Sequence, residues 1–230
     1  MKTIAVTEHL TQLTRLHFVN AFLVREDDGF TLVDTTLSGG AGALIDAARE
    51  AGAPIRRIAL THGHSDHAGS LDALRERLGD DVEVLIPELD ARILAGEPVV
   101  EGKPAGSWPT VRTAPDRRLT AGDRVGSLEV VATPGHTPGH VAFLDTRDRA
   151  VIAGDTFTAY GRLVTSDRVR LPFPLAATAT WNGDETLASA RIVRGLEPSV
   201  MVVGHGPVVR DPAVAIDRAL ALAGAVAAAA

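Results

Sequence analysis

The 230-residue sequence contains no cysteine, which excludes disulfide bonds and thiolate nucleophiles. The same absence excludes every zinc site that depends on cysteine sulfur. Any bound metal must therefore be held by histidine nitrogen and carboxylate oxygen. Aromatic residues are also scarce at 4% of the chain, and Tyr160 supplies the single phenol hydroxyl in the sequence.

An excess of positive charge is absent as well, since 23 Lys and Arg residues face 29 Asp and Glu residues and the formal net charge is −6. Nucleic-acid-binding proteins normally present a basic face, so this balance argues against a nucleic-acid partner. No apolar run reaches the ~18–20 residues of a membrane span, and the first residues lack the apolar core of about 7–15 residues that marks a secretory signal. We therefore expect no membrane association and a cytoplasmic location.

The remaining composition is that of an ordinary globular protein, with 45% apolar and 23% charged residues. No linker or internal repeat divides the chain, so residues 1–230 are expected to form a single domain. Strand-like segments dominate the first 35 residues and return from Leu128 to Ala153, and each β-rich part is followed by helical patterns. This order predicts an α/β (α+β) fold with two packed sheets and helices on their outer faces.

The sequence also predicts several individual elements and loops. Composition predicts a strand over Leu16–Arg25 and a helix over Thr178–Leu196. Gly96–Asp116 carries several prolines and is predicted to be a long surface loop, and Arg162–Pro174 is a second irregular segment. A final helix is expected to open at Pro212, because proline suits the first helical turn.

The most informative segment is Thr61–Gly69, which reads THGHSDHAG between a predicted strand and a predicted helix. His62 and His64 alternate, so their side chains point the same way at the end of the strand. Asp66 and His67 follow where the loop turns into the helix. Four convergent donors favour a bound cation over a plain surface loop, and imidazole and carboxylate without sulfur suit Zn²⁺, Fe, Mn²⁺ or Co²⁺.

Three later segments each place one donor just beyond a short apolar strand, with glycine beside it. The donors are His136 in PGHTPGH, Asp155 in GDT and His205 in GHG. Glycine allows a sharp turn and the close approach of another group. Strand ends that carry polar residues into one crevice are typical of active sites in α/β proteins. Each motif alone is more often a plain turn, but together with THGHSDHAG they indicate one metal centre.

The motifs HGHSDH, GHTPGH, GDT and GHG, in this order, resemble those of the metallo-β-lactamase superfamily over roughly Asn20 to Gly206. That resemblance implies a four-layer αββα sandwich with a metal site along one edge, between the two sheets. The segment Val33–Thr35 is also similar to the superfamily. Its Asp34 is expected to support the ligands from behind, as is His140, which has no ligand role there.

The resemblance further implies a ligand set for two metal ions. By position, the first ion is bound by His62, His64 and His136, the second by Asp66, His67 and His205, and Asp155 bridges the two. Asp66 and Asp155 are the candidate catalytic residues. An alternative for Asp66 is that it leaves the metal in a mononuclear form and helps to move a proton.

Two divalent ions about 3.5–4 Å apart would supply hydroxide at neutral pH without a protein nucleophile, with Zn²⁺ as the first expectation. The resulting hypothesis is hydrolysis of a small ester-like substrate, a lactone or another carboxylic ester. A glyoxalase II-like thioesterase and a di-iron redox member of the superfamily remain alternatives. Native β-lactamase activity is not expected, because the cysteine-ligand class is impossible here and the histidine-rich class lacks the bridging aspartate present at Asp155.

Substrate contacts are expected from Gly96–Ser107 with Trp108 and from Arg162–Trp181. These Pro-rich loops with a few large apolar side chains are typical of an apolar lid over the metals, although simple surface coverage explains them equally well. Trp108, Tyr160 and Phe173 are the candidate pocket residues. Lactonases of the superfamily often use a tyrosine three residues after the bridging aspartate, whereas Thr158 holds that position here, which leaves the role of Tyr160 open. The expected partner is a small-molecule substrate, and the expected assembly is a monomer or a homodimer.

Overall fold

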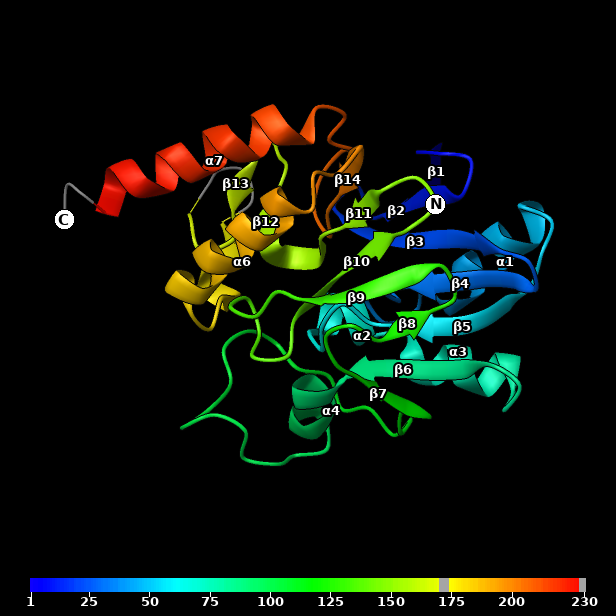
Figure 1. The fold of residues 1–230 in the computed structure, drawn as a ribbon. Helices are drawn as coiled ribbons and strands as arrows, with labels where there is room; N and C mark the ends of the chain where they lie inside the picture. The colour runs from blue at the N-terminus through cyan, green and yellow to red at the C-terminus, as the bar shows by residue number, and fades with distance from the viewer. Residues whose placement is uncertain (170–173, 228–230) are drawn as a thin grey trace.

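The computed structural model describes residues 1–169 and 174–227, which form two β-sheets lying face to face (Figure 1). The seven strands of the first sheet follow one another in chain order: β1 (Lys2–Ala5), β2 (Leu10–Arg15), β3 (Val19–Glu26), β4 (Gly29–Val33), β5 (Ile55–Ala59), β6 (Glu83–Pro87) and β7 (Arg117–Leu119). The pairs from β1 to β4 are antiparallel, and those from β4 to β7 are parallel.

The second sheet has five strands, in the spatial order β14 (Val200–Val202), β11 (Ala150–Ile152), β10 (Val141–Asp145), β9 (Leu128–Ala132) and β8 (Arg124–Val125). Its pairs are antiparallel except for β11 with β14, which are parallel. A separate two-stranded ribbon joins β12 (Phe157–Thr158) to β13 (Val164–Thr165). The carboxyl ends of β11 and β14 therefore lie next to each other at one edge.

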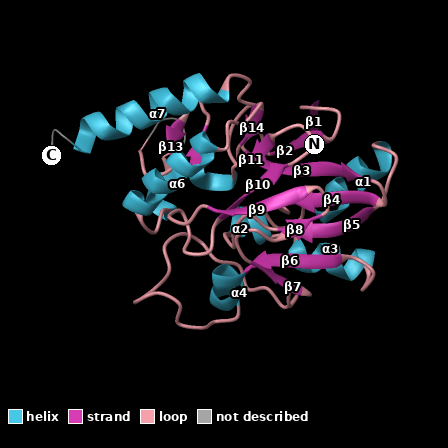
Figure 2. Ribbon diagram, viewed as in Figure 1, coloured by secondary structure: helices cyan, strands magenta, loops and turns pink. Residues whose placement is uncertain are grey.

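Helices cover the outer face of each sheet (Figure 2). Those that follow strands of the first sheet are α1 (Ala41–Glu50), α2 (Ser65–Ala68), α3 (Leu71–Leu78) and α4 (Glu88–Leu94). Those associated with the second sheet are α5 (Leu175–Ala179), α6 (Gly183–Gly195) and α7 (Pro212–Ala227), together with the short 3₁₀ helix η1 (Gly154–Thr156). The predicted opening of the last helix at Pro212 is confirmed.

Three separate apolar clusters show that these elements form four layers. Leu44 of α1 and Leu74 of α3 pack on the outer face of the first sheet. Phe22 of β3 and Phe143 of β10 meet between the two sheets. A third cluster, which includes Val193 of α6, lies beyond the second sheet. Central strands buried on both faces are what such a sandwich requires, and the predicted αββα fold is confirmed.

One predicted strand is wrong at its beginning. The strand expected over Leu16–Arg25 starts at Val19, and the residues before it form the antiparallel partner β2. Leu16 and His17 adopt left-handed backbone conformations, with φ of 52° and 66°, and close the hairpin between β2 and β3. Composition alone gave no sign of this turn, because neither residue is one that usually adopts a positive φ.

The helix expected over Thr178–Leu196 is in fact two helices. The chain leaves α5 after Ala179, and α6 begins only at Gly183. The break is set by Asn182, whose side-chain oxygen accepts hydrogen bonds from the backbone N–H groups of Asp184 and Glu185 at 3.1 and 3.2 Å. A side chain that satisfies the first free N–H groups of a helix fixes where that helix starts.

The two segments expected to be irregular differ in outcome. Gly96–Asp116 contains no helix or strand in the described structure, as predicted. Arg162–Pro174 includes the short strand β13, and residues 170–173, with the candidate Phe173, lie outside the described residues. Among the helices of the described ranges, none is both long and apolar enough to cross a bilayer.

The role of Asn182 gives a test of this account of α6. Asn182→Ala removes the acceptor for two helix N–H groups and is expected to lower the free energy of unfolding by about 1 kcal/mol. Asn182→Gly leaves those groups accessible to water and is expected to lower the free energy of unfolding by only a few tenths of about 1 kcal/mol. Urea denaturation of the two variants measures the difference, and equal losses would contradict the capping role.

Candidate metal centre

All seven predicted ligands lie at one edge of the sandwich, where strands of both sheets end. The loop after β5 carries His62, His64, Asp66 and His67 from the first sheet. The loops after β9, β11 and β14 carry His136, Asp155 and His205 from the second sheet. Four loops that are far apart in the sequence therefore meet at one place. The structure places all seven side chains together, and six of them are 3% exposed or less.

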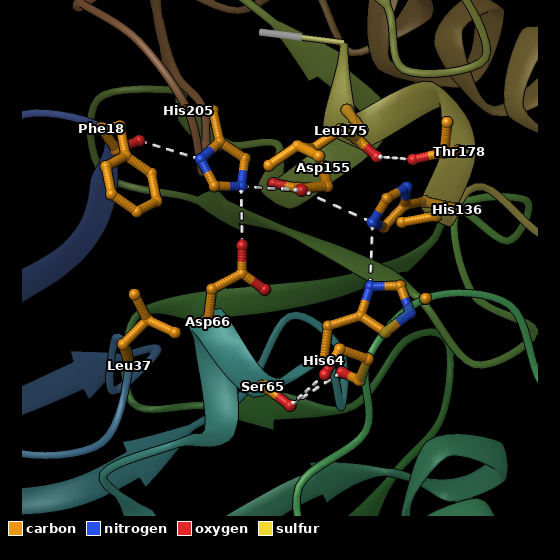
Figure 3. Close-up of a pocket in the computed structure, with 14 residues that line it drawn as sticks. Phe18, Leu37, His64, Ser65, Asp66, His136, Asp155, Leu175, Thr178 and His205 are labelled. Carbon is orange, nitrogen blue, oxygen red and sulfur yellow. Dashed lines mark hydrogen bonds and ion pairs between the residues drawn. The ribbon is translucent and has the colours of Figure 1, made fainter.

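The donor atoms fall into three overlapping groups. In each group one atom per residue lies within 4.8 Å of the others: His62 with His64 and His136, His62 with His67 and Asp155, and Asp66 with His67 and His205. Asp155 connects the two ends of the cluster. Its carboxylate lies 3.5 Å from Nε2 of His67. It also lies 3.5 Å from Nε2 of His136 and 3.2 Å from Nε2 of His205 (Figure 3).

Each of the five clustered histidines is held by its second ring nitrogen. The partners are Thr61 Oγ1 for His62, the Ala105 carbonyl for His64, Asp34 for His67, Thr180 Oγ1 for His136 and the Phe18 carbonyl for His205, at 2.8 to 3.1 Å. A hydrogen bond at one nitrogen fixes the tautomer and turns the other nitrogen inward, as in metal-binding histidines. All five rings are thus oriented with one nitrogen toward the same space.

Several donor atoms in that space have no protein partner. Nε2 of His62, Nε2 of His67 and Oδ1 of Asp155 are buried without a hydrogen bond. A buried polar atom without a partner costs about 1–3 kcal/mol, so three such atoms facing one another call for a common partner. A cation satisfies imidazole nitrogen and carboxylate oxygen at once, and the donor set therefore fits a divalent metal.

The protonation of the site has a clear physical basis. Burial lowers the pKa of His62 well below its usual value, so this imidazole is neutral and ready to ligate. Burial also acts to lower the pKa of His67, but the carboxylates of Asp155, Asp34 and Asp66 outweigh it and raise that pKa to about 9. Burial likewise acts to lower the pKa of His205, but Asp155 and Asp66 outweigh it and raise that pKa well above its usual value. Protons thus occupy positions that a cation would take.

Asp34 and His140 lie behind the cluster rather than in it. Asp34 is fully buried and accepts hydrogen bonds from the Thr61 N–H at 2.8 Å, the Thr61 hydroxyl at 2.9 Å and Nδ1 of His67 at 2.8 Å. His140 accepts the backbone N–H of Asp155 at its Nε2, 2.9 Å away, and its Nδ1 contacts Thr133. Both residues orient a donor of the cluster.

Asp90 is a functional residue that sequence reasoning missed. This fully buried carboxylate, on α4, accepts hydrogen bonds from the Gly63 N–H at 2.8 Å, the Thr137 hydroxyl at 2.7 Å and the Gly139 N–H at 2.8 Å. It therefore ties the loop of His62 and His64 to the loop of His136. Burial raises the pKa of Asp90 to about 6. Nothing in its local sequence marks it, because its partners come from two distant loops.

The candidate pocket residues do not lie where the sequence suggested. The Trp108 indole donates to the Ala105 carbonyl at 2.7 Å, and its ring packs edge-on against His64 with 5.0 Å between ring centres. Trp108 thus supports a ligand from behind and is not among the residues that line the cavity. Tyr160 donates to the Phe18 carbonyl at 2.9 Å and lines a different hollow. Both were predicted as pocket residues, and neither lines the cavity at the cluster. The predicted segments Gly96–Ser107 and Arg162–Trp181 do contribute to its walls, with Gly106, Ser107, Leu175, Ala176, Thr178 and Ala179.

The cavity at the centre has a volume of about 420 Å³. Its floor contains five of the predicted ligands: His64, Asp66, His136, Asp155 and His205. The walls come from the β2–β3 hairpin, the segment after β4, the loop before Trp108 and helix α5. The residues of these walls are Phe18, Leu37, Ser65, Gly106, Ser107, Leu175, Ala176, Thr178 and Ala179.

Comparison with known proteins connects this geometry to a family. The model of the metallo-beta-lactamase superfamily matches residues 14–205. The protein YobT of Bacillus subtilis is 38% identical over 221 residues, which are 92% of this chain and 93% of YobT. A hydroxyacylglutathione hydrolase of Mesorhizobium japonicum is 31% identical over 202 residues, covering 79% of this chain and 72% of that enzyme.

A solved structure extends the comparison to three dimensions. TTHA1623, described in a di-iron-bound form, superimposes with a TM-score of 0.63 and 30% sequence identity. The match covers 86% of this chain and 91% of that one. The shared architecture agrees with the four layers.

The raised pKa of His67 predicts how metal affinity depends on pH. Because a metal ion must displace the proton of His67, whose pKa is about 9, affinity should strengthen as the pH rises toward that value. Each displaced proton contributes about tenfold per pH unit. Competition with a chromophoric chelator from about pH 6 to about pH 8 measures the slope, and an affinity that stays constant over this range would contradict the assignment.

The position of Asp90 predicts a loss of metal affinity without any change of ligand. Asp90→Asn replaces an acceptor with an amide donor facing the loop N–H groups, and we expect metal affinity to fall about 10–100-fold. Asp72→Asn is the matched control, because Asp72 also accepts backbone N–H bonds from a loop, at Arg112 and Thr113, but contacts no ligand loop. Equal metal affinities in the two variants would refute the bracing role.

Proposed function

The chain belongs to the metallo-β-lactamase superfamily, and from that premise we propose that it is a metal-dependent hydrolase of a small ester-like substrate. A lactone or another carboxylic ester is the substrate class proposed. The observation that carries this proposal is the group of inward-facing imidazole and carboxylate atoms, several of them buried without a partner, at the floor of a cavity of about 420 Å³. Such a floor suits hydrolysis of a molecule small enough to be enclosed.

We propose two metal positions that share one carboxylate. His62, His64 and His136 would hold the first ion, and Asp66, His67 and His205 the second, with Asp155 between them. When bound, two divalent ions lower the pKa of a water molecule and polarise a carbonyl group, which is the chemistry that ester hydrolysis needs. In the overall reaction the ester C–O bond breaks, and water supplies OH to the acyl carbon and a proton to the departing oxygen.

The alternative role for Asp66 is that it leaves the metal in a mononuclear form and helps to move a proton. Its side chain is 30% exposed, whereas the side chains of His205 and Asp155 beside it are 1% and 2% exposed. Burial acts to raise the pKa of Asp66, but His67 and His205 outweigh it, so the carboxylate is ionised. An ionised carboxylate suits a ligand of the second ion, and its partial exposure is what supports the alternative, because a proton carrier needs access to solvent.

A thioesterase is the second candidate function. It is favoured by the similarity to the hydroxyacylglutathione hydrolase of Mesorhizobium japonicum. A glutathione tail, however, carries two carboxylates, and the described residues that line the cavity include no Lys or Arg to pair with them. A charge buried without a partner costs several kcal/mol, so the cavity suits a neutral ester better.

The identity of the metal is proposed on chemistry alone. Zn²⁺ is our first proposal, because it is bound by histidine nitrogen and carboxylate oxygen and needs no redox partner. Iron is the alternative, favoured by the di-iron-bound form of TTHA1623, and with it a redox role. We further propose that residues 1–230 act as a single domain, as a monomer or homodimer, on a small molecule in the cytoplasm.

The proposed function is tested with Asp155→Asn, which preserves shape and removes the shared negative charge. We expect metal content to fall and ester hydrolysis to drop at least about 100-fold, because both metal positions lose the negative charge of the carboxylate that they share. Asp217→Asn, a surface substitution on α7, is the control and should retain both properties. Elemental analysis and kcat/KM for a lactone, an aryl ester and a thioester provide the readout. Full hydrolysis by metal-stripped protein would overturn the proposal.

A further inference from the structure

Apolar side chains from three separate segments line the cavity at the metal centre. In Figure 3, Phe18 lies next to His205, Leu37 next to Asp66, and Leu175 of α5 next to Asp155. Ala176 and Ala179 continue the wall at α5. A reacting carbonyl at Asp155 would therefore have apolar surface next to it.

The apolar wall at α5 is anchored to the metal centre itself. Thr180, just beyond α5, donates its hydroxyl to the Ala176 carbonyl at 2.8 Å and contacts Nδ1 of His136 at 3.0 Å. The backbone N–H of Trp181 also donates to the His136 carbonyl at 3.0 Å. Because the same segment holds a ligand and continues the wall, the wall has a fixed distance from the reacting position.

Two of the apolar side chains present surface to the cavity. Leu175 is 61% exposed and Leu37 is half-buried, while the Phe18 ring stacks on His205 with 6.3 Å between ring centres. A single exposed leucine needs no explanation, but three apolar side chains around one cavity form a surface that an apolar group would cover. Each methylene group of a ligand that is buried against this surface makes the free energy of binding more favourable.

The charges of the cavity restrict what that group is. Among its described lining residues, the titratable side chains are Asp66, Asp155 and three histidines of the metal cluster, and none is Lys or Arg. Outside the cluster the polar groups are the hydroxyls of Ser65, Ser107 and Thr178. Nothing there pairs with a charge on a substrate away from its reacting carbonyl, which makes a neutral substituent the better fit.

We propose that the substrate carries an uncharged aliphatic chain next to its scissile carbonyl, and that Phe18, Leu37 and Leu175 bind this chain. The inference rests on the proposed hydrolase function for the position of the carbonyl, and it adds the chemistry of the neighbouring group. Leu37 and Leu175 are thereby specificity-determining residues of the reaction.

The test compares straight-chain acyl esters of one alcohol, from acetyl to decanoyl, with the metal-loaded protein. We expect kcat/KM to rise about fourfold for each added methylene until the cavity is filled. Leu37→Ala and Leu175→Ala should each reduce this rise. Leu222→Ala is the matched control, since Leu222 is 40% exposed on α7 and lines a different hollow. Esters with a carboxylate at the far end of the chain should react at least about tenfold more slowly than neutral esters of equal length.

A binding measurement separates this inference from the proposed function. Methyl ketones of increasing chain length present the same aliphatic chain without a bond to hydrolyse, and calorimetry with metal-loaded protein should show affinity rising with length. A rise for ketones without hydrolysis of any ester would overturn the hydrolase proposal and leave the apolar site standing. Hydrolysis with no dependence on chain length, or a preference for carboxylated chains, would overturn the inference and leave the hydrolase standing. Equal slopes for Leu175→Ala and Leu222→Ala would remove Leu175 from the site.

Discussion

A carboxylate that is 2% exposed, Asp155, lies within 3.5 Å of imidazole nitrogens from His67, His136 and His205, and the rest of the molecule is arranged around that contact. A buried charge is tolerable only with opposite charge beside it. The backbone of Asp155 is held by His140, and Gly204 leaves it room, since a side-chain carbon at Gly204 would overlap its carboxylate. Protons on the histidines balance this charge without metal, and divalent ions would balance it in the proposed enzyme.

The sandwich serves the centre by bringing loops from two sheets to one edge, and buried carboxylates then fix those loops. Asp34 holds His67 and Thr61 in the loop after β5, while Asp90 ties that loop to the one that carries His136. Helix α5 is joined to His136 through Thr180 and also forms a wall of the cavity. Ligand geometry and substrate surface thus depend on the same short segments, which is how a rigid scaffold keeps a reactive centre precise.

Local patterns were sufficient to predict the four layers and the donor motifs, because strand periodicity and HGHSDH are both contained in short windows. Residues whose roles depend on contacts between distant segments were missed or misassigned. Asp90 has no motif of its own, and Trp108, expected in a lid, packs against His64 through a loop far along the chain. Phe18 was not recognised because the hairpin turn at Leu16 and His17 has no glycine to mark it, and Leu37, in the segment after β4, has no motif of its own. The break before α6 depended on one side-chain cap at Asn182.

The most direct test of the central claim is a titration of metal-depleted protein with Zn²⁺, followed by elemental analysis and by kcat/KM for a neutral straight-chain ester. The account predicts that the protein binds two ions per chain and that hydrolysis reaches its maximum as the second position fills, because Asp155 serves both. Two results would contradict this prediction. One is that Asp155→Asn binds the ions that saturate the activity as well as the unsubstituted protein does. The other is hydrolysis that does not depend on added metal.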